Sequence, residues 1–312
     1  MPWNDRIRRR IKLRDLDLLM AVIDTGSMGK AAGRFHMTQP AVSKVVAELE
    51  QTLGVRLLER SRQGVEPTLH GRALVKRGIA VFDELRQGVE DLDFLSDPTA
   101  GDVRVGASEP LAAAIVAPVI DRLSRRYPRM CFHAVTGDSA TLYPQLAARN
   151  VELIISRMPG PVSEEYSADV LFRDRSVVVT GANNPLCSRR KLALAELVNE
   201  RWALGPPDSL SGTVQAEIFR TCGLPMPRLT VTTVSVNLRN ELLATGRFLT
   251  IFPGFSLRLP RSHPSLRALS VQLPDMPTPI AIVTLRNRTL SRAMELFVDE
   301  VRYITRPLTK DK

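Results

Sequence analysis

The segment Thr38–Glu50, with the sequence TQPAVSKVVAELE, predicts a short helix with an apolar face and a polar N-terminal end. Thr38 is a suitable N-cap, and Pro40 is tolerated in the first turn because its missing N–H would be unbonded there. Apolar residues recur at helical spacing along one side: Val42, Val46, Leu49 and Leu53. Polar side chains lie off this stripe, near the first turns: Gln39, Ser43 and Lys44. Such a helix suits insertion of its N-terminus into a DNA major groove, although an ordinary amphipathic surface helix has the same pattern.

The residues before this helix predict two further helices. Leu13–Thr25 has a helical apolar pattern that stops at Gly26, and Ser27 is placed to cap a second helix over Met28–Phe35. A short connection then leads to the helix described above. Two short helices joined by a tight turn, with a longer helix in front, form a helix-turn-helix, and this context favours the DNA-reading interpretation.

The segment Val55–Thr68 predicts a β-hairpin after the helix-turn-helix. Strand-like residues flank a polar turn that contains Gly64. A hairpin beside a DNA-reading helix is a wing, from which Arg60 and Arg62 would reach phosphates or a minor groove. The two arginines could instead be solvated loop residues, but the neighbouring helices favour the DNA contact.

Positive charge is concentrated in the first quarter of the chain. The 312 residues carry a net charge of +10, and residues 1–80 account for +7 of it, with 15 Lys and Arg against 8 Asp and Glu. This distribution predicts that one end meets a polyanion, with nucleic acid the first candidate and an anionic membrane surface the second. Residues 1–12 form either a basic arm that adds phosphate contacts or a solvated terminus.

Other functional classes find no support in the sequence. The chain has room for two or three domains, no apolar run long enough to span a membrane, and a charged N-terminus unlike a secretory signal, so a cytoplasmic protein is expected. The three cysteines and four histidines are scattered, which argues against a disulfide framework or a metal site. Phosphate-loop, nucleophile-elbow and HExxH patterns are absent, so we expect no cofactor and no enzyme activity.

The first domain carries a specific set of residues at specific spacings. They are Leu16, Ser27, Ala31, Ala32, Thr38, Gln39, Pro40, Ala41, Val42, Ser43, Lys44, Leu49, Glu50, Leu53, Gly54, Leu57, Arg60, Thr68 and Gly71. With these residues, positions 13–71 resemble the N-terminal domain of the LysR-type transcriptional regulators. Three departures replace one apolar residue by another, at Met28, Phe35 and Leu58, and Val45 stands where the family often has a polar residue. The resemblance implies a winged helix-turn-helix over residues 13–70, all-α apart from the wing. It covers nearly the whole chain, because the length and the order of the later elements agree.

The resemblance also implies which residues contact DNA. The candidates are Ser27, Lys30, Arg34, Thr38, Gln39, Pro40, Ser43, Lys44, Arg60, Arg62, Pro67 and Thr68. The partner it implies is double-stranded promoter or operator DNA, with RNA polymerase as a further partner. Whether the protein activates or represses transcription is left open.

One long helix is predicted from His70 to Leu95. Its apolar side holds Val81, Leu85, Val89, Leu92 and Leu95. A long helix beside a small domain needs a partner for such a stripe. By resemblance, residues 71–96 are a linker helix that pairs with a second subunit, which implies a homodimer and further assembly to a homotetramer. Packing of the stripe on its own chain is the alternative. Residues 96–101 then break the helix and form a hinge.

From Asp102 onward, predicted strands and helices alternate, which favours open, largely parallel sheets. By resemblance, residues 97–312 form an α/β effector-binding domain with the fold of periplasmic binding proteins. The chain would build one subdomain from about 101–173 and 277–306, and a second from about 174–276.

Polar residues follow several of the predicted strands, where ligands bind in such sheets. The candidates for effector contacts are Ser108, Glu109, Thr136, Asp138, Arg157, Ser209 and Ser235. Plain N-capping by Ser108, Ser139 and Ser235 would explain part of this pattern equally well. Since Glu109 and Asp138 are acidic, a polyol, sugar or amine is as plausible a ligand as an aromatic acid.

The sequence therefore predicts a DNA-binding transcriptional regulator whose activity is set by a small-molecule inducer bound between two subdomains. One alternative is a regulator that senses oxidants through cysteine, for which Cys187 and Cys222 lack a flanking basic pair. The other is a small-molecule binding protein with an accessory N-terminal domain.

Overall fold

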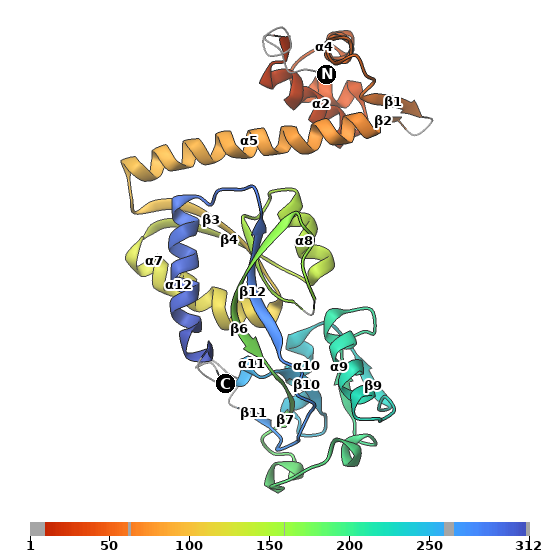
Figure 1. The fold of residues 1–312 in the computed structure, drawn as a ribbon, viewed down its shortest axis with the longest axis vertical. Coiled ribbons are helices and arrows are strands. Elements are labelled where there is room, and N and C mark those ends of the chain that lie inside the picture. Colours follow the sequence, from red (N-terminus) through yellow and green to blue (C-terminus); the bar gives the residue numbers. More distant parts are fainter. Residues whose placement is uncertain (1–9, 62–63, 159, 259–264, 310–312) are drawn as a thin grey trace. The chain divides into compact units, whose positions relative to one another are not determined.

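The computed structural model describes residues 10–61, 64–158, 160–258 and 265–309 of the chain (Figure 1). The chain divides into two compact units, Met1–Val89 and Glu90–Lys312. The basic arm predicted for residues 1–12 falls almost wholly outside the described ranges. Among the described helices, none combines the length and the apolar character that a membrane crossing requires.

The first unit is a helical domain built on the predicted apolar stripes. Its helices are α2 (Leu13–Thr25), α3 (Met28–Arg34), α4 (Gln39–Leu53) and the first part of α5 (Leu69–Ser96). Val42 of α4 packs with Val22 of α2 and Ala31 of α3, and all three side chains are buried. The small side chain of Ala31 lets the helices approach closely. Gly54 ends α4 in the left-handed conformation, with φ 71°, which glycine adopts at little cost. These helices confirm the prediction from periodicity.

The predicted wing is present and is tied to α4. Strands β1 (Leu58–Ser61) and β2 (Gly64–Pro67) pair antiparallel, with Leu58 opposite Pro67. The Oε1 atom of Glu50 in α4 accepts hydrogen bonds from the backbone N–H groups of Leu57 at 2.7 Å and Leu58 at 3.1 Å. One carboxylate therefore positions the start of the wing relative to the helix.

The second unit contains a five-stranded sheet in the order β4-β3-β5-β12-β6. Its strands are β3 (Ala100–Ala107), β4 (Arg129–Thr136), β5 (Leu153–Arg157), β6 (Tyr166–Asp174) and β12 (Thr278–Leu285). Alternate residues of β5 face opposite sides, since Leu153 and Ile155 belong to one core cluster and Ile154 to another. Helices α7 (Ala117–Arg126) and α12 (Arg292–Thr309) cover the first side, and α8 (Ser139–Ala147) covers the second (Figure 1). We call this layered body the first subdomain.

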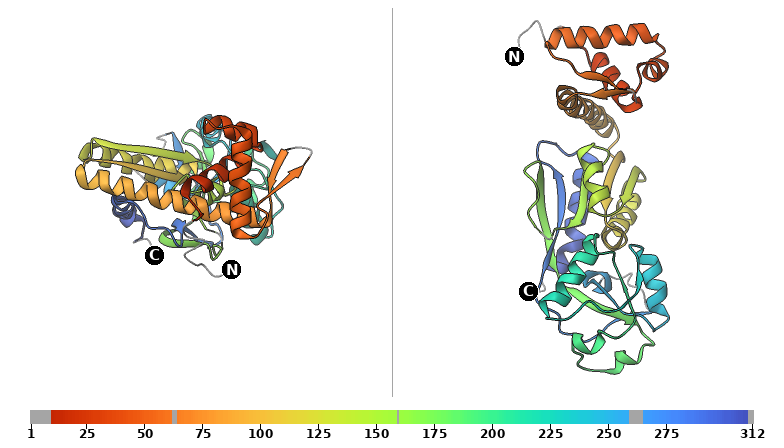
Figure 2. Two further views of the ribbon diagram at one scale, coloured as in Figure 1. Left: turned by 90° about the horizontal axis from the view of Figure 1, so that it is seen from above. Right: turned by 90° about the vertical axis from the view of Figure 1, so that its right-hand side faces the viewer.

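The second subdomain lies between β6 and β12 in the sequence. It holds a three-stranded sheet of β10 (Thr250–Pro253), β7 (Ser176–Gly181) and β11 (Leu266–Ala268), and a pair of β8 (Trp202–Leu204) and β9 (Leu229–Thr232). Val178 and Val179 of β7 face two different cores, which contain Phe219 of α9 (Leu210–Thr221) and Leu243 of α10 (Val236–Ala244). Helices therefore lie on both sides of the sheet (Figure 2, right). The remaining elements are short: α11 (Phe255–Arg258), η2 (Pro185–Ser188) and η3 (Leu194–Leu197).

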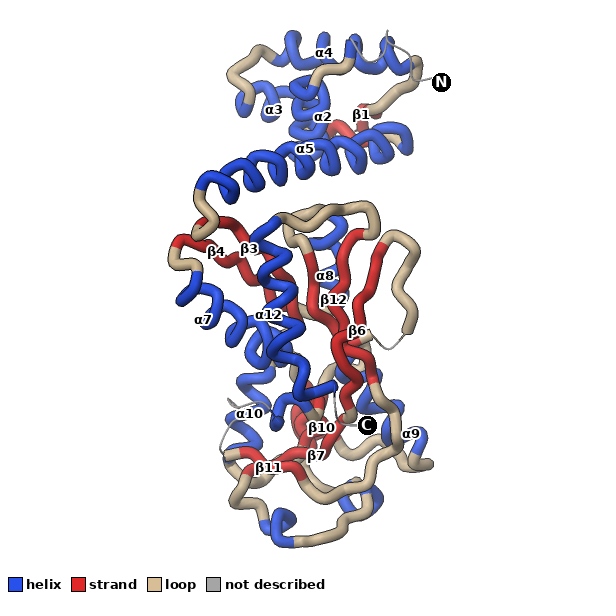
Figure 3. The backbone as a smooth tube through the Cα atoms, turned by 60° about the vertical axis from the view of Figure 1, so that its left-hand side comes forward, coloured by secondary structure: helices blue, strands red, loops and turns tan. Residues whose placement is uncertain are grey.

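The sheets are mixed, so the prediction of largely parallel sheets was wrong. β3 is parallel to β4 and β5, but β12 is antiparallel to both β5 and β6, and β7 is antiparallel to both of its neighbours. The reason is the path of the chain. β6 leads out of the first subdomain and β12 returns beside it, so the two strands must run in opposite directions (Figure 3).

A helix begins almost directly after β3. It starts with α6 (Glu109–Leu111) and continues through the π-helical turn η1 (Ala112–Val116) into α7. Pro110 lies in the first turn, where its missing N–H is no loss, and does not delay the helix. Ser108 and Glu109 are thereby placed at a helix N-terminus directly after β3.

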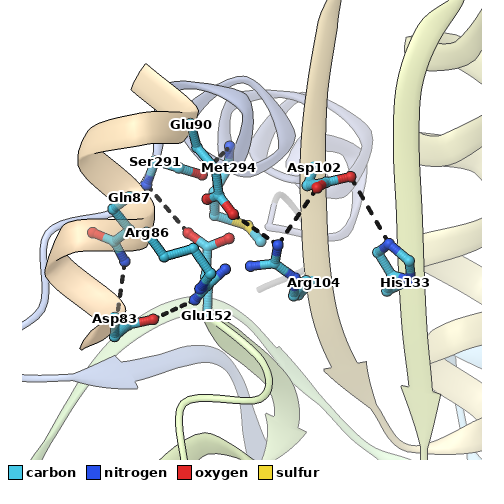
Figure 4. A network of polar contacts seen from close by, with 10 residues as sticks. All are labelled: Asp83, Arg86, Gln87, Glu90, Asp102, Arg104, His133, Glu152, Ser291 and Met294. Atoms are coloured by element: carbon cyan, nitrogen blue, oxygen red, sulfur yellow. Dashed lines mark hydrogen bonds and ion pairs between the residues drawn. The ribbon is translucent and has the colours of Figure 1, made fainter. Parts of the chain in front are cut away.

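The last residues of α5, which belong to the second unit, are connected to β3 by charged side chains (Figure 4). Arg104 of β3 forms ion pairs with Glu90 of α5 at 2.7 Å and with Asp102 at 3.5 Å. The side chains of Arg104 and Glu90 are only 20% and 17% exposed, so loss of either partner would leave a charge in a poorly solvated position. This contact ties the middle of β3 to Glu90, near the end of α5.

We expect the substitution Glu50→Ala to lower the free energy of unfolding of the first unit by about 1–3 kcal/mol, because two backbone N–H groups lose their acceptor. Urea denaturation followed by circular dichroism measures the change. Glu48→Ala, on the same helix, is the control, since Glu48 is exposed and makes only a 3.9 Å ion pair with Lys44. Equal effects of the two substitutions would contradict the assigned role of Glu50.

Candidate functional site

The N-terminal end of α4 presents polar side chains to solvent. Thr38 is the N-cap, although its side chain makes no capping hydrogen bond. Thr38, Gln39, Pro40 and Lys44 are exposed and Ser43 is half-buried, whereas the apolar stripe of the same helix is buried. The side chains that could read base edges are therefore free of the core.

The start of α3 lies beside the start of α4. Ser27 caps α3 by accepting a hydrogen bond from the backbone N–H of Lys30 at 3.4 Å, as predicted. At Gly29, an added Cβ would come within 4 Å of both the Ser27 hydroxyl and the Gln39 side-chain oxygen. The candidate residues Ser27, Lys30 and Gln39 thus form one exposed edge, with Lys30 itself exposed.

The other candidate DNA-contacting residues differ in whether their side chains already have partners within the protein. Arg34 forms an exposed ion pair with Asp24 at 2.6 Å. The Thr68 hydroxyl donates to the carbonyl of Arg56 at 2.8 Å and accepts from the N–H of Gly71 at 3.0 Å, so it already holds the wing to α5. Pro67 ends β2, Arg60 lies in β1 opposite Val65, and Arg62 lies outside the described residues.

A cavity of about 400 Å³ opens among the loops of the second unit. Six of the seven candidate effector residues line it: Ser108, Glu109, Thr136, Asp138, Arg157 and Ser209. Ser235 does not line the cavity; it caps α10 by accepting from the N–H of Leu238 at 3.2 Å, while its neighbours Val234 and Val236 face the space. A cavity of this size is typical of small-molecule sites.

The helices around the cavity are capped differently from the expectation. Asp138, not Ser139, caps α8, and its carboxylate accepts from the N–H of Thr141 at 2.9 Å and from the Thr141 hydroxyl at 2.8 Å. These hydrogen bonds lower the pKa of Asp138, so the carboxylate is ionised at neutral pH. Ser209 caps α9 and also donates to the carbonyl of Pro206 at 2.6 Å, which leaves its hydroxyl engaged within its own loop.

Two arginines reach the cavity from different subdomains. Arg157 ends β5 in the first subdomain and donates to the Thr278 hydroxyl at 3.4 Å. Arg239 extends from α10 in the second subdomain, is 4% exposed, and stacks over the Phe252 ring with 5.0 Å between guanidinium carbon and ring centroid. The Nε atoms of both arginines are buried and have no hydrogen-bond partner among the described residues.

Burial dominates the electrostatics of both guanidinium groups. It lowers the pKa of Arg239 to about 10, an effect that the charge of Glu109 partly opposes. Burial also lowers the pKa of Arg157, against the charge of Asp174. Both side chains remain protonated at neutral pH, so the protein holds two incompletely solvated cations at one cavity.

Glu109 links the two subdomains across the cavity. Its Oε2 atom accepts from the backbone N–H of Val236, in the first turn of α10, at 3.4 Å. The positive end of that helix favours a carboxylate at this position. Glu109 thereby occupies part of the donor set that α10 offers to the cavity.

The sequence interpretation missed Arg239, Phe252 and Gln215. The side chain of Gln215 bridges two loops, because its Oε1 accepts from the N–H of Gly205 and its Nε2 donates to the carbonyl of Ile251, each at 2.9 Å. Arg239 lies four residues after Ser235, which the sequence did single out as a helix cap. Its position as a cation in the first turn of that helix was the signal that could have identified it as a cavity residue.

The cysteines are reduced and lie on separate elements. Cys131 is in β4, Cys187 in η2 and Cys222 directly follows α9, and none forms a disulfide. The structure therefore places no cysteine pair at the cavity, whose described lining contains no cysteine.

Comparison with known families accounts for both parts of the chain. Residues 13–72 match the family model described as "Bacterial regulatory helix-turn-helix protein, lysR family", and residues 96–304 match "LysR substrate binding domain". The HTH-type transcriptional regulator GbpR of Azospirillum brasilense is 29% identical over 80% of this chain and 74% of its own length. PcaQ of Agrobacterium fabrum is 26% identical over 95% of this chain and 96% of its own length.

Solved structures have the same fold. A full-length OxyR variant from Pseudomonas aeruginosa matches 97% of this chain and 99% of its own, with a TM-score of 0.68 and 21% identity. Full-length CbnR in complex with its target DNA matches 94% of this chain and 100% of its own, with a TM-score of 0.62 and 18% identity. These likenesses confirm the expected combination of a helix-turn-helix domain and a two-part α/β domain.

We expect the substitution Arg239→Met to raise the free energy of unfolding of the ligand-free protein by about 1–3 kcal/mol, since it removes a poorly solvated charge. Burial lowers the pKa of Arg239 from its usual range to about 10, so the penalty is fully present at neutral pH and is relieved only as the pH rises through about 10. Urea denaturation at pH 7 measures the difference.

The matched control is Arg247→Met. Arg247 also lies over a phenylalanine, with 5.9 Å to the Phe248 ring, but it is exposed and should change stability little. A loss of stability on Arg239→Met would show that the guanidinium is compensated in the folded protein and would contradict the expectation.

Proposed function

The chain belongs to the LysR family of bacterial transcriptional regulators, and from this premise we propose how its residues bind DNA, assemble and sense an effector. It is a DNA-binding regulator, as its relatives are. The observation that carries the proposal is the exposed polar end of α4, which is presented by a helix-turn-helix whose apolar stripe is buried. The limits 13–70, 71–96 and 97–312 for its three functional parts belong to the same proposal.

The proposed DNA-reading edge consists of the starts of α3 and α4. Gln39 and Ser43 supply side chains that both donate and accept hydrogen bonds, which suits contacts to base edges in a major groove. Lys44 and Lys30 supply charge for phosphates. Arg60 and Arg62 of the wing are proposed to contact phosphate or the minor groove. Arg34 and Thr68 support the domain through Asp24 and the Arg56 carbonyl, and any DNA contact by them is secondary.

We expect Lys44→Ala to weaken binding to the DNA upstream of the gene about tenfold, and to reduce the slope of log K against log salt concentration by about 1, because one phosphate contact is lost. Gel-shift titrations at several salt concentrations measure both quantities. Lys191→Ala, which removes an exposed lysine from the second unit, is the control for the change in net charge. The proposed edge is wrong if Lys44→Ala and Gln39→Ala both bind as the parent protein does.

The protein is proposed to dimerise through α5 and to assemble further into a tetramer. The apolar side chains of the predicted stripe are exposed: Val81, Leu85, Val89, Leu92 and Leu95 range from 40% to 76% exposure. Their spacing keeps them on one side of the helix, where a second copy of the same helix would bury them. This favours pairing between subunits over packing on the same chain.

We expect the double substitution Leu85→Glu and Leu92→Glu to reduce the mass in solution toward that of one 34.6 kDa chain, since the apolar stripe would then carry charge. Light scattering after gel filtration measures the mass. Met226→Glu, at a residue that is 44% exposed elsewhere on the surface, should leave the assembly unchanged. An unchanged mass for the double variant would place the subunit interface elsewhere.

The cavity of the second unit is proposed as the effector site. Strand β3 is followed directly by Ser108 and Glu109 on the cavity, and Arg104 in the middle of the strand pairs with Glu90 of α5. A ligand that shifts the relative position of the two subdomains would act on β3, and through Glu90 on the linker helix. Altered contact with RNA polymerase at the promoter is the proposed output of that shift.

A further inference from the structure

The two arginines at the cavity are its least compensated charges. Arg239 is only 4% exposed, and Arg157 is half-buried. In the part of the chain that the structure describes, neither guanidinium forms an ion pair with a carboxylate, and each has a buried Nε–H that donates to no acceptor. A poorly solvated cation without an ion-pair partner is costly, so two of them at one cavity favour an anionic occupant.

The carboxylates near the cavity are engaged elsewhere. Asp138 accepts two hydrogen bonds from Thr141 at the start of α8. Glu109 faces the N–H of Val236 at the start of α10. Asp174 accepts from the N–H groups of Gly254 at 2.9 Å and Phe255 at 2.8 Å. Backbone donors and helix N-termini thus offset each negative charge, whereas no group offsets either arginine to the same extent.

We propose that the effector is a small dianion, such as a dicarboxylate, that bridges the subdomains with one anionic group on Arg157 and the other on Arg239. This inference rests on the proposed effector site and names the chemical class that the site takes. Both guanidinium groups present a planar fork of donors that fits a carboxylate. The stacking of Arg239 on Phe252 keeps its fork in place before the ligand arrives.

The other residues that line the cavity indicate the chemistry of the part of the ligand between its two anionic groups. Apolar side chains at the cavity include Leu142, Val214, Ile251 and Phe252, and free hydroxyl groups include Ser108 and Thr136. A short hydrocarbon segment with one or two hydroxyl groups would match both kinds of contact. A volume of about 400 Å³ suits a compact molecule, and a neutral sugar or an amine would bring no negative charge to either arginine.

Thermal melting of the full chain with a set of probes at constant ionic strength tests this inference. The probes are malonate, succinate, glutarate and adipate, with butyrate, succinamide, galactose and putrescine as the monoanionic, neutral and cationic comparisons. We expect at least one dicarboxylate to raise the melting temperature with saturation, as binding to the folded state requires, while the comparison compounds do not.

The variants identify the groups responsible. Arg157→Met and Arg239→Met should each weaken the dicarboxylate at least about tenfold, and Arg247→Met, the exposed arginine stacked on Phe248, should leave its affinity unchanged. Glu109→Gln keeps an acceptor for the Val236 N–H but removes a negative charge, so it should strengthen the dicarboxylate severalfold.

Three results would overturn the proposal of a dianionic effector. They are saturable binding of galactose or putrescine but of no dicarboxylate, butyrate binding as tightly as the best dicarboxylate, or a dicarboxylate-induced shift in melting temperature that survives both arginine substitutions.

DNA binding by the same preparations separates the test of the ligand class from the test of the proposed function. A protein that binds its upstream DNA and responds to a neutral or cationic probe is still an effector-controlled regulator with a different ligand class. Loss of DNA recognition would instead count against the proposed function.

Discussion

The structure of the second unit depends on strand β3, which is tied to α5 in its middle and leads to the cavity at its end. In the middle of the strand, Arg104 pairs with Glu90 of α5 in a poorly solvated position, where separating the charges is costly. Along its length, β3 forms parallel ladders with β4 and β5, and Val103 and Val105 are fully buried. At its end, the chain turns directly into the helix that carries Glu109. The strand therefore connects the cavity to Glu90, near the end of α5.

The cavity exists because the chain crosses between two subdomains. β6 leads out of the first sheet and β12 returns beside it, so the second subdomain is an insertion that faces the first across a gap. Each body contributes a cation, and Glu109 bonds from one body to the start of α10 in the other. The unfavourable burial of Arg157 and Arg239 is understandable if stability is sacrificed for ligand binding, as is common at functional sites.

Much of the fold could be predicted because its signals are local. The stripe of Val42, Val46 and Leu49 predicts α4 by period alone, and Gly54 marks its end. The loops after buried strands gave six residues that line the cavity, since strand ends and helix caps leave polar residues in the sequence. Ser139 was mistaken for the cap of α8 because Asp138 and Ser139 are both good caps, and only the backbone path selects Asp138.

Arg239 marks the limit of reasoning from the chain alone. As a residue in a short helix it is indistinguishable from a solvated arginine, and its burial depends on Phe252 and on the opposing subdomain. The sequence by itself determined the helix-turn-helix, the long linker helix and the alternation of strands and helices, because periodicity and capping act within a few residues. Only the tertiary structure decided the mixed direction of the sheets and the charge of the cavity, because both arise from contacts between segments far apart in the chain.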